Sequence, residues 1–446
     1  MQDSRFTYSF DTLRQISQDI LDQAKKAGAS ACEAEVSQGF GQSVTVRLDE
    51  VETIEYNRDK GLGVSVYFGQ RRGHASTSDL SPAAILDTVK AACSIAKHTA
   101  SDEFAGLADE ALLAKNPPEL DLYYPWELPV EKAIVLAQEC EAAAMGVDSR
   151  VNNSEGASVS IQESLFVYGN SSGFLGSYPS TRHGISCAVL AESEQGMQRD
   201  YWYTSARDAA DLESARSVGR MAGERTVRRL DARKLKTMQA PVLFEAPLAA
   251  SLIGHFVGAV SGGSLYRKSS FLLDSLGTEV FAPFIRLQEL PHLPKGLASS
   301  PFDNEGVATR SRDVIKDGVV QGYFLSSYSA RKLGMTSTGN AGGSHNLILA
   351  DTGQDFDALL RQMDRGLLVT ELLGQGVNPV TGDYSRGAAG FWVEGGKIQY
   401  PVEEITIAGN LKDMFRNIVA VGNDVVVRGA RQCGSILIGQ MTVAGE

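Results

Sequence analysis

Residues 31–48, ACEAEVSQGFGQSVTVRL, carry the clearest structural pattern at the start of the chain. Apolar and polar side chains alternate over 32–37 and again over 43–48, with Leu48 as the last apolar member. A period of two is that of a β-strand with one buried face. This stretch therefore predicts strands in a sheet that is covered on one side.

The residues on either side of this stretch predict helices and more strands. Apolar residues at helical spacing run from Leu13 to Ala27, and Gly28 is placed to end that helix. Further strands are expected around 64–68 and 74–78, joined by a turn at 69–73, and Ser81-Pro82 is a typical helix start. Helix, several strands and helix in this order indicate an α+β layer.

The middle of the chain has two candidate boundaries. Residues 100–129 contain four prolines without periodicity, which is typical of a connector. We expect a helix over about 129–145, strands over much of 157–203 and one long helix over about 208–230. A second boundary at about 231–240 then divides the chain into an N-terminal α+β domain (1–115), a middle α+β segment packed with it (116–235) and a C-terminal domain (236–446).

The C-terminal domain differs from the rest of the chain in its glycine content and in the length of its apolar runs. It is dense in glycine and has short apolar runs separated by turns, with a helix expected near 249–260. Many short strands joined by glycine turns predict a β-rich domain for which a barrel is one natural form. The predicted fold class is α+β, with mixed α/β layers followed by this β-rich, barrel-like domain.

Composition limits the classes of function. The chain has 446 residues and a net charge of −12, which argues against binding to nucleic acid or to a membrane surface. No basic and apolar leader and no apolar run of the roughly 18–20 residues that a spanning helix needs is present. Five scattered cysteines are typical of reduced thiols. We expect a cytoplasmic protein.

Motifs for zinc hydrolysis or serine chemistry are weak. None of the six histidines is followed by glutamate, so a local zinc-protease helix is absent, although a site built from distant ligands stays open. Gly169–Gly173 matches G-x-S-x-G, but its apolar flanks predict a hairpin turn rather than a nucleophile elbow. The residue pattern alone therefore gives no active site.

Phosphate-loop motifs and single residues also favour structural interpretations. Gly395-Gly396 is expected in a hairpin turn, and Gly61–Gly63 lies inside a strand pattern. Cys433 is interpreted as a small buried side chain and His255 as a structural histidine on an apolar helix.

Several long stretches match a known family. They are Gly262–Ser269 (GGSLYRKS), Lys295–Asp303 (KGLASSPFD), Thr381–Trp392 (TGDYSRGAAGFW) and Ile407–Met414 (IAGNLKDM). With them the chain resembles the PmbA/TldE branch of the TldD/PmbA metalloprotease family over nearly its whole length. The resemblance implies a cytoplasmic heterodimer with a TldD-like subunit that degrades unfolded or small peptides.

The same resemblance implies where the metal lies. In the TldD subunit, a helix with the motif H-E-x-x-x-H and a later cysteine hold a metal, expected to be zinc. The corresponding residues here are Gly254 and Ala259 in place of the histidines, His255 in place of the glutamate, and Cys433 at the cysteine position. We therefore expect no catalytic or metal-binding residue and no cofactor in this chain, and an inactive isolated subunit.

Two alternatives stay open at this point. One is a self-sufficient metallopeptidase or other hydrolase with an unrecognised site. The other is a regulatory protein-binding module of the gyrase-modulator type. For the leading hypothesis we also expect that strand edges help to hold an extended peptide, and that the isolated chain self-associates as a homodimer through the surface meant for its partner.

Overall fold

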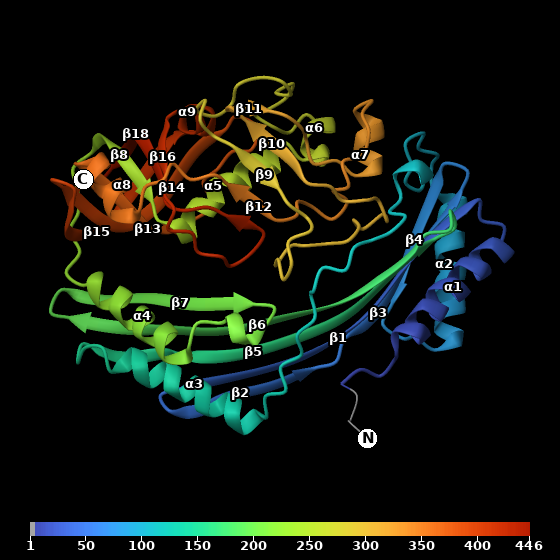
Figure 1. The fold of residues 1–446 in the computed structure, drawn as a ribbon, viewed down its shortest axis with the longest axis horizontal. Coiled ribbons are helices and arrows are strands. Elements are labelled where there is room, and N and C mark those ends of the chain that lie inside the picture. Colours follow the sequence, from blue (N-terminus) through green and yellow to red (C-terminus); the bar gives the residue numbers. More distant parts are fainter. Residues whose placement is uncertain (1–4) are drawn as a thin grey trace.

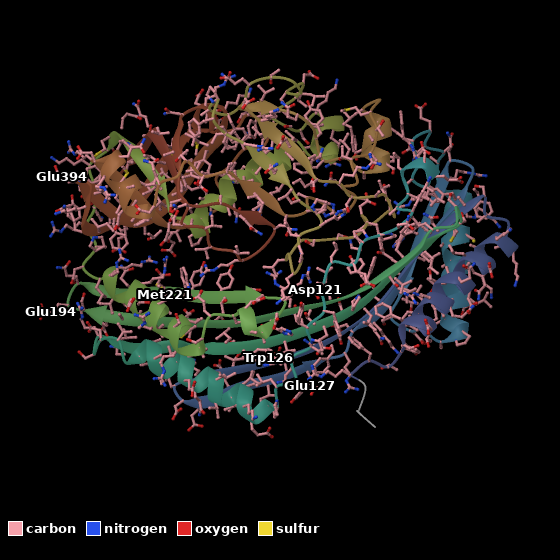
Figure 2. All side chains as sticks on the ribbon, viewed as in Figure 1. Asp121, Trp126, Glu127, Glu194, Met221 and Glu394 are labelled. Atoms are coloured by element: carbon pink, nitrogen blue, oxygen red, sulfur yellow. The ribbon has the colours of Figure 1, made fainter. Side chains whose placement is uncertain are left out.

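The computed structural model describes residues 5–446. Figure 1 shows a long curved sheet with helices on its outer side, and a C-terminal part that lies over its concave side. The labelled Asp121, Trp126 and Glu127 in Figure 2 mark the connector that crosses the sheet. Within this described range, no helix is both long and apolar enough to cross a membrane.

The large sheet is antiparallel and joins the first half of the chain into one layer. Its order is β4-β3-β1-β5-β6-β7, and β2 pairs with the far end of β1. The strands are β1 (Ala31–Arg47), β2 (Glu50–Asn57), β3 (Lys60–Phe68), β4 (Arg71–Thr77), β5 (Val151–Asn170), β6 (Leu175–Ser193) and β7 (Gly196–Ala206). Because β1 pairs with β5 from Glu33–Asn170 to Val46–Ala157, segments 1–115 and 116–235 share this sheet.

The predicted alternation of β1 is confirmed, with two local corrections. Its alternate residues are buried throughout, but the strand ends at Arg47, and Leu48 lies in the turn with φ 51° and half of its surface exposed. The second correction concerns the turn expected at 69–73, which is shorter because β4 already begins at Arg71. Hairpin turns at Gly169–Gly173 and Gly395-Gly396 are confirmed.

Four helices cover the outer side of the sheet. They are α1 (Phe10–Lys26), α2 (Pro82–His98), α3 (Val130–Met145) and α4 (Ala215–Arg228). Ser81 caps α2 as expected, since its hydroxyl accepts from the backbone N–H of Ala84. Two single turns, η1 (Glu110–Leu112) and η2 (Ala209–Asp211), lie in the connections.

The long helix expected over 208–230 is wrong at its start. η2 is a separate turn, and α4 begins only after Ser214, whose hydroxyl accepts from the N–H of Ser217. Glycines then bring α4 into backbone contact with α3, because a Cβ at Gly219 would lie 1.8 Å from the carbonyl oxygen of Cys140. Close helix packing therefore depends on glycine at this position.

The C-terminal part contains a closed five-stranded barrel, as the glycine-dense pattern predicts. The order β15-β14-β13-β8-β18 closes through a β15–β18 pairing, and β16 extends β18. The strands are β8 (Met238–Phe244), β13 (Gly366–Leu373), β14 (Asp383–Glu394), β15 (Lys397–Asn410), β16 (Ile418–Val421) and β18 (Ile436–Ala444). Their alternate residues form one buried core together with α5 (Ala246–Ala259).

A second, smaller sheet lies beside the barrel, in the order β11-β10-β9-β12-β17. Its strands are β9 (Leu287–Glu289), β10 (Arg312–Lys316), β11 (Val319–Val320), β12 (Leu347–Leu349) and β17 (Arg431–Gln432). Four further helices complete this part: α6 (Gly262–Tyr266), α7 (Ser327–Lys332), α8 (Phe356–Met363) and α9 (Leu411–Arg416).

Arg207 fastens the C-terminal part to the sheet. Its guanidinium is 8% exposed and donates to the carbonyl oxygens of Gly296, Leu297 and Thr181 at 2.9–3.1 Å. Burial lowers the pKa of Arg207 to about 10, but the side chain stays charged at neutral pH. Because it satisfies carbonyls of both parts, this residue fixes their spacing.

Candidate functional site

Helix α5 carries the positions that the sequence singles out. Leu252, Ile253 and Phe256 face the barrel core, so Gly254 and His255 lie on the half-exposed side of the helix. Figure 1 shows α5 on the side of the C-terminal part that is nearest to the large sheet. The start of the helix is anchored because the N–H of Ala246 donates to the hydroxyl of Ser435.

The guanidinium of Arg431 fills the space above Gly254. A Cβ added to Gly254 would lie 1.9 Å from Nη1 and 3.0 Å from Cζ of Arg431. A side chain of any kind at position 254 therefore competes with this cation for the same space. Arg431 belongs to β17 and is itself exposed.

Ala259 points in a different direction from Gly254. It is 3% exposed and belongs to the barrel core, at the last residue of α5. Five residues at 3.6 per turn place these two positions about 140° apart around the helix axis. The structure thus does not bring Gly254 and Ala259 to one face.

His255 packs against Tyr384 of β14 and is within electrostatic range of Arg386 on the same strand. The rings of His255 and Tyr384 meet edge to face, with centroids 5.9 Å apart and planes at 82°. Burial lowers the pKa of His255, and the charges of Arg386 and Arg431 lower it further. The imidazole is therefore neutral at physiological pH and lies beside two cations.

Cys433 lies close to the same cation but is inert. It is 2% exposed, and burial, with a smaller effect of Asp424, raises the pKa of its thiol to about 12. The charge of Arg431 opposes this shift without overcoming it. Cys433 is therefore the small buried side chain that the sequence predicts.

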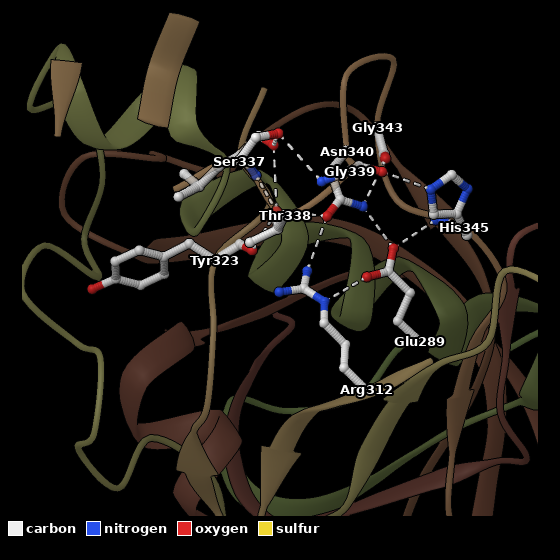
Figure 3. Close-up of polar contacts among 10 residues, drawn as sticks. Glu289, Arg312, Tyr323, Ser337, Thr338, Gly339, Asn340, Gly343 and His345 are labelled. Carbon is white, nitrogen blue, oxygen red and sulfur yellow. Dashed lines mark hydrogen bonds and ion pairs between the residues drawn. The ribbon is translucent and has the colours of Figure 1, made fainter. Parts of the chain in front are cut away.

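A buried polar network holds β17 in place. Glu289 is 1% exposed and accepts from Arg312 Nε at 2.8 Å, Asn340 Nδ2 at 2.7 Å and the N–H of His345 at 2.9 Å (Figure 3). These bonds fix the loop that leads into β12, and β12 pairs in parallel with β17, Leu347 opposite Arg431. The position of Arg431 therefore depends on a carboxylate two strands away, on β9.

The side chains present do not fit a metal. In the range 5–446 no three His, Cys, Asp or Glu side chains lie together as a metal ion would require. Gly254 and Ala259 have no side-chain donor atoms, which leaves Cys433 as a single thiol, and a guanidinium lies above Gly254. Most other histidines serve structural bonds, such as His183 to the carbonyl of Tyr124 and His292 to the hydroxyl of Thr309. The described residues thus offer no site of distant ligands.

A cavity of about 590 Å³ separates β7 from the C-terminal part. Its lining includes Trp202, Tyr203, Arg428 and Gln432, the residue after Arg431. The guanidinium of Arg428 lies 3.9 Å from the ring centre of Trp202 and 4.0 Å from that of Tyr203. These cation–π contacts make the wall of the cavity aromatic and basic.

Sequence reasoning found α5 and Cys433 but missed Tyr384, Arg386 and Arg431. These three come from strands more than 120 residues away from α5 and meet it only through the barrel topology. One signal was available. Gly254 lies in the interior of an apolar helix, where glycine costs stability and its presence indicates a close approach of another group.

Three family models match the chain in sequence order. They describe PmbA/TldA metallopeptidase domain 1 (residues 32–96), the central domain (123–230) and the C-terminal domain (237–445). The metalloprotease PmbA of Escherichia coli O157:H7 is 53% identical over 426 residues, which is 96% of this chain and 94% of that relative.

Solved structures confirm the fold. A proposed modulator of DNA gyrase from Bacteroides thetaiotaomicron has a TM-score of 0.93 and 29% identity, and the match covers 98% of this chain and 100% of that one. TldE from Thermococcus kodakarensis has a TM-score of 0.82 and 19% identity, with 96% and 100% covered. The second likeness is one of fold alone.

Proposed function

The chain belongs to the PmbA/TldA metallopeptidase family, and from this premise we propose that it is the subunit that assists proteolysis without binding the catalytic metal. The metal and the general base belong to a TldD-like partner, and the substrates are unfolded or small peptides. One observation carries this proposal: the guanidinium of Arg431 occupies the place of a side chain at position 254.

The physical reason is electrostatic and steric. A divalent cation needs anionic or neutral donors, and a positive charge beside them opposes its binding. His255 is a weaker base than a free imidazole, because burial and the charges of Arg386 and Arg431 lower its pKa, so it is a poor replacement for the missing glutamate. The chain therefore contributes shape and binding surface rather than water activation.

The 590 Å³ cavity supports a role in holding peptide. It runs along β7, the last strand in the order of the large sheet, and no strand of the described chain pairs with its outer edge. An extended peptide can add to such an edge by main-chain hydrogen bonds. The basic and aromatic wall around Arg428 suits side chains of an unfolded segment.

A surface for the partner is supported by β2. The whole strand is exposed, and the exposed fractions of Val51, Ile54 and Tyr56 are 42%, 44% and 55%. A strand with apolar side chains and a free edge is suited to association, including the homodimer expected of the isolated chain. Ile54→Glu should weaken assembly by light scattering, whereas Ile95→Glu, on α2 and 47% exposed, should not.

The deciding experiment measures peptidase activity and metal content with and without a TldD-like subunit. We expect the isolated chain to leave an unfolded peptide intact and to contain no stoichiometric zinc. The mixture should cleave, and a chelator should abolish cleavage. Chelator-sensitive cleavage by the isolated chain would overturn the proposal, and co-purification with gyrase instead of a TldD-like subunit would favour the regulatory alternative.

A further inference from the structure

Three polar atoms beside α5 have no hydrogen-bond partner in the described structure. They are the hydroxyl of Tyr384, Nε of Arg386 and Nε2 of His255. Tyr384 is 1% exposed, so its hydroxyl is buried without a partner. Buried polar groups are nearly always paired, and an unpaired set at one place indicates a missing ligand.

These atoms belong to one neighbourhood. Tyr384 and Arg386 are two residues apart on β14, so their side chains leave the same face of the strand. The ring of His255 contacts that of Tyr384. Burial raises the pKa of Tyr384 and the charge of Arg386 opposes that shift, whereas burial and then the charges of Arg386 and Arg431 lower the pKa of His255. His255 therefore lies in ring contact with Tyr384 and within electrostatic range of both arginines.

The missing partner must be a hydrogen-bond acceptor, and the two nearby arginine charges favour one that is negatively charged. Nε of an arginine only donates, and a tyrosine hydroxyl can donate. Among residues 5–446 neither Arg386 nor Arg431 has a carboxylate within ion-pair distance. The acid nearest to Cys433 is already engaged, since Asp424 accepts from both the N–H and the hydroxyl of Ser435. Two cations thus remain without a counter-charge.

We propose that His255, Tyr384, Arg386 and Arg431 form a receptor for a peptide carboxylate at the place where the family motif would hold a metal. The choice of a carboxylate rests on the proposed function, because carboxylates are the anions that peptides carry. Arginine forks match the two oxygens of a carboxylate, and the Tyr384 hydroxyl supplies a third donor.

In this proposal, the place that would hold a metal in the family motif binds a carboxylate instead. A metal in a peptidase attracts the carbonyl oxygen of the peptide bond to be cut. Two guanidinium groups would instead attract the C-terminal carboxylate or an acidic side chain of the bound peptide. Gly254 is then required because any larger residue displaces the Arg431 guanidinium.

The test uses the full chain and one fluorescent peptide in two forms, with a free C-terminal carboxylate and with a C-terminal amide. Fluorescence anisotropy should give at least about tenfold tighter binding of the free acid. Tyr384→Phe and Arg386→Gln should each reduce that ratio severalfold. Arg267→Gln, an exposed arginine on the segment after α6, is the control that should leave it unchanged.

A third peptide identifies the source of the carboxylate. It is amidated and carries one internal glutamate, and binding as tight as the free acid assigns the receptor to side-chain carboxylates. Equal binding of the free acid and both amides, or no binding of any of them at millimolar concentration, overturns the proposal. The outcome is separate from peptidase activity. If the mixture with the partner cleaves peptide but this chain shows no carboxylate preference, only the receptor proposal is wrong. If this chain prefers the free acid but the mixture does not cleave, only the assisting-subunit role is wrong.

Discussion

Replacing Gly254 by alanine tests how Arg431 is held. The added Cβ would lie 1.9 Å from Nη1, whereas ordinary contacts between heavy atoms are about 3.5–4.0 Å. The guanidinium must therefore move by about 1.5 Å or more. Arg431 is exposed, and its side chain has no partner in the described range, so we expect it to swing outward at small cost.

The helix gains from the same change. Alanine is favoured over glycine in a helix interior by about 0.8–1 kcal/mol. The free energy of unfolding should therefore rise by about 0.5–1 kcal/mol despite the clash. Gly258→Ala is the matched control in the same helix, because no atom lies within 4 Å of its added Cβ.

Urea unfolding followed by circular dichroism measures both variants. We expect similar stabilisation of both, and loss of the free-acid preference in peptide binding only for Gly254→Ala. If Gly254→Ala is instead less stable than Gly258→Ala by more than about 1 kcal/mol, the guanidinium cannot move aside. The reasoning about a mobile, unpaired Arg431 would then be wrong.

The remaining predictions concern buried charges. Glu289→Ala leaves the half-buried Arg312 without a counter-charge and removes the acceptor of Asn340 and of the His345 N–H, so urea unfolding should record a loss of about 2–4 kcal/mol, against under about 1 for Asp313→Ala at an exposed ion pair; equal losses would contradict this. Burial, helped by a neighbouring glutamate, raises the pKa of Asp303 from 3.8 to about 7. The folded state then binds this proton more tightly, so the stabilisation is complete below pH 3.8 and is lost as the pH rises through about 7. Thermal unfolding of Asp303→Asn should vary less with pH over that window, and an unchanged pH profile would exclude the assignment. Arg207→Ala frees three carbonyl oxygens, and limited proteolysis should cleave residues 293–299 faster than in the unchanged chain; equal rates would mean that other contacts fix this segment.

Local pattern was sufficient for much of the fold. The alternation in β1, the Ser81 cap of α2 and the glycine turns each act within a few residues, and each appears where expected. The barrel followed from many short strands with glycine turns. The break between η2 and α4 was not predicted. Composition suggested one helix over 208–230, although η2 is a separate turn.

The candidate site was predictable only in part, because its members are not neighbours in sequence. The family motif identifies Gly254, His255, Ala259 and Cys433 as the positions to compare. It shows which ligands are absent, but it does not show that Arg431 fills the space above Gly254. Arg431 is brought to Gly254 by the pairing of β17 with β12, which depends on the loop held by Glu289. Long-range pairing of this kind leaves no periodic trace.

The packing around α5 also has a consequence for any attempt to build a metal site into this chain. A histidine introduced at 254 would collide with Arg431, and a histidine at 259 would enter the packed core. Neither step gains metal affinity by itself, and each disturbs what is already there. A metal site with the ligands of the family motif would therefore require at least two substitutions, together with displacement of Arg431 and repacking around position 259, so no single substitution creates one.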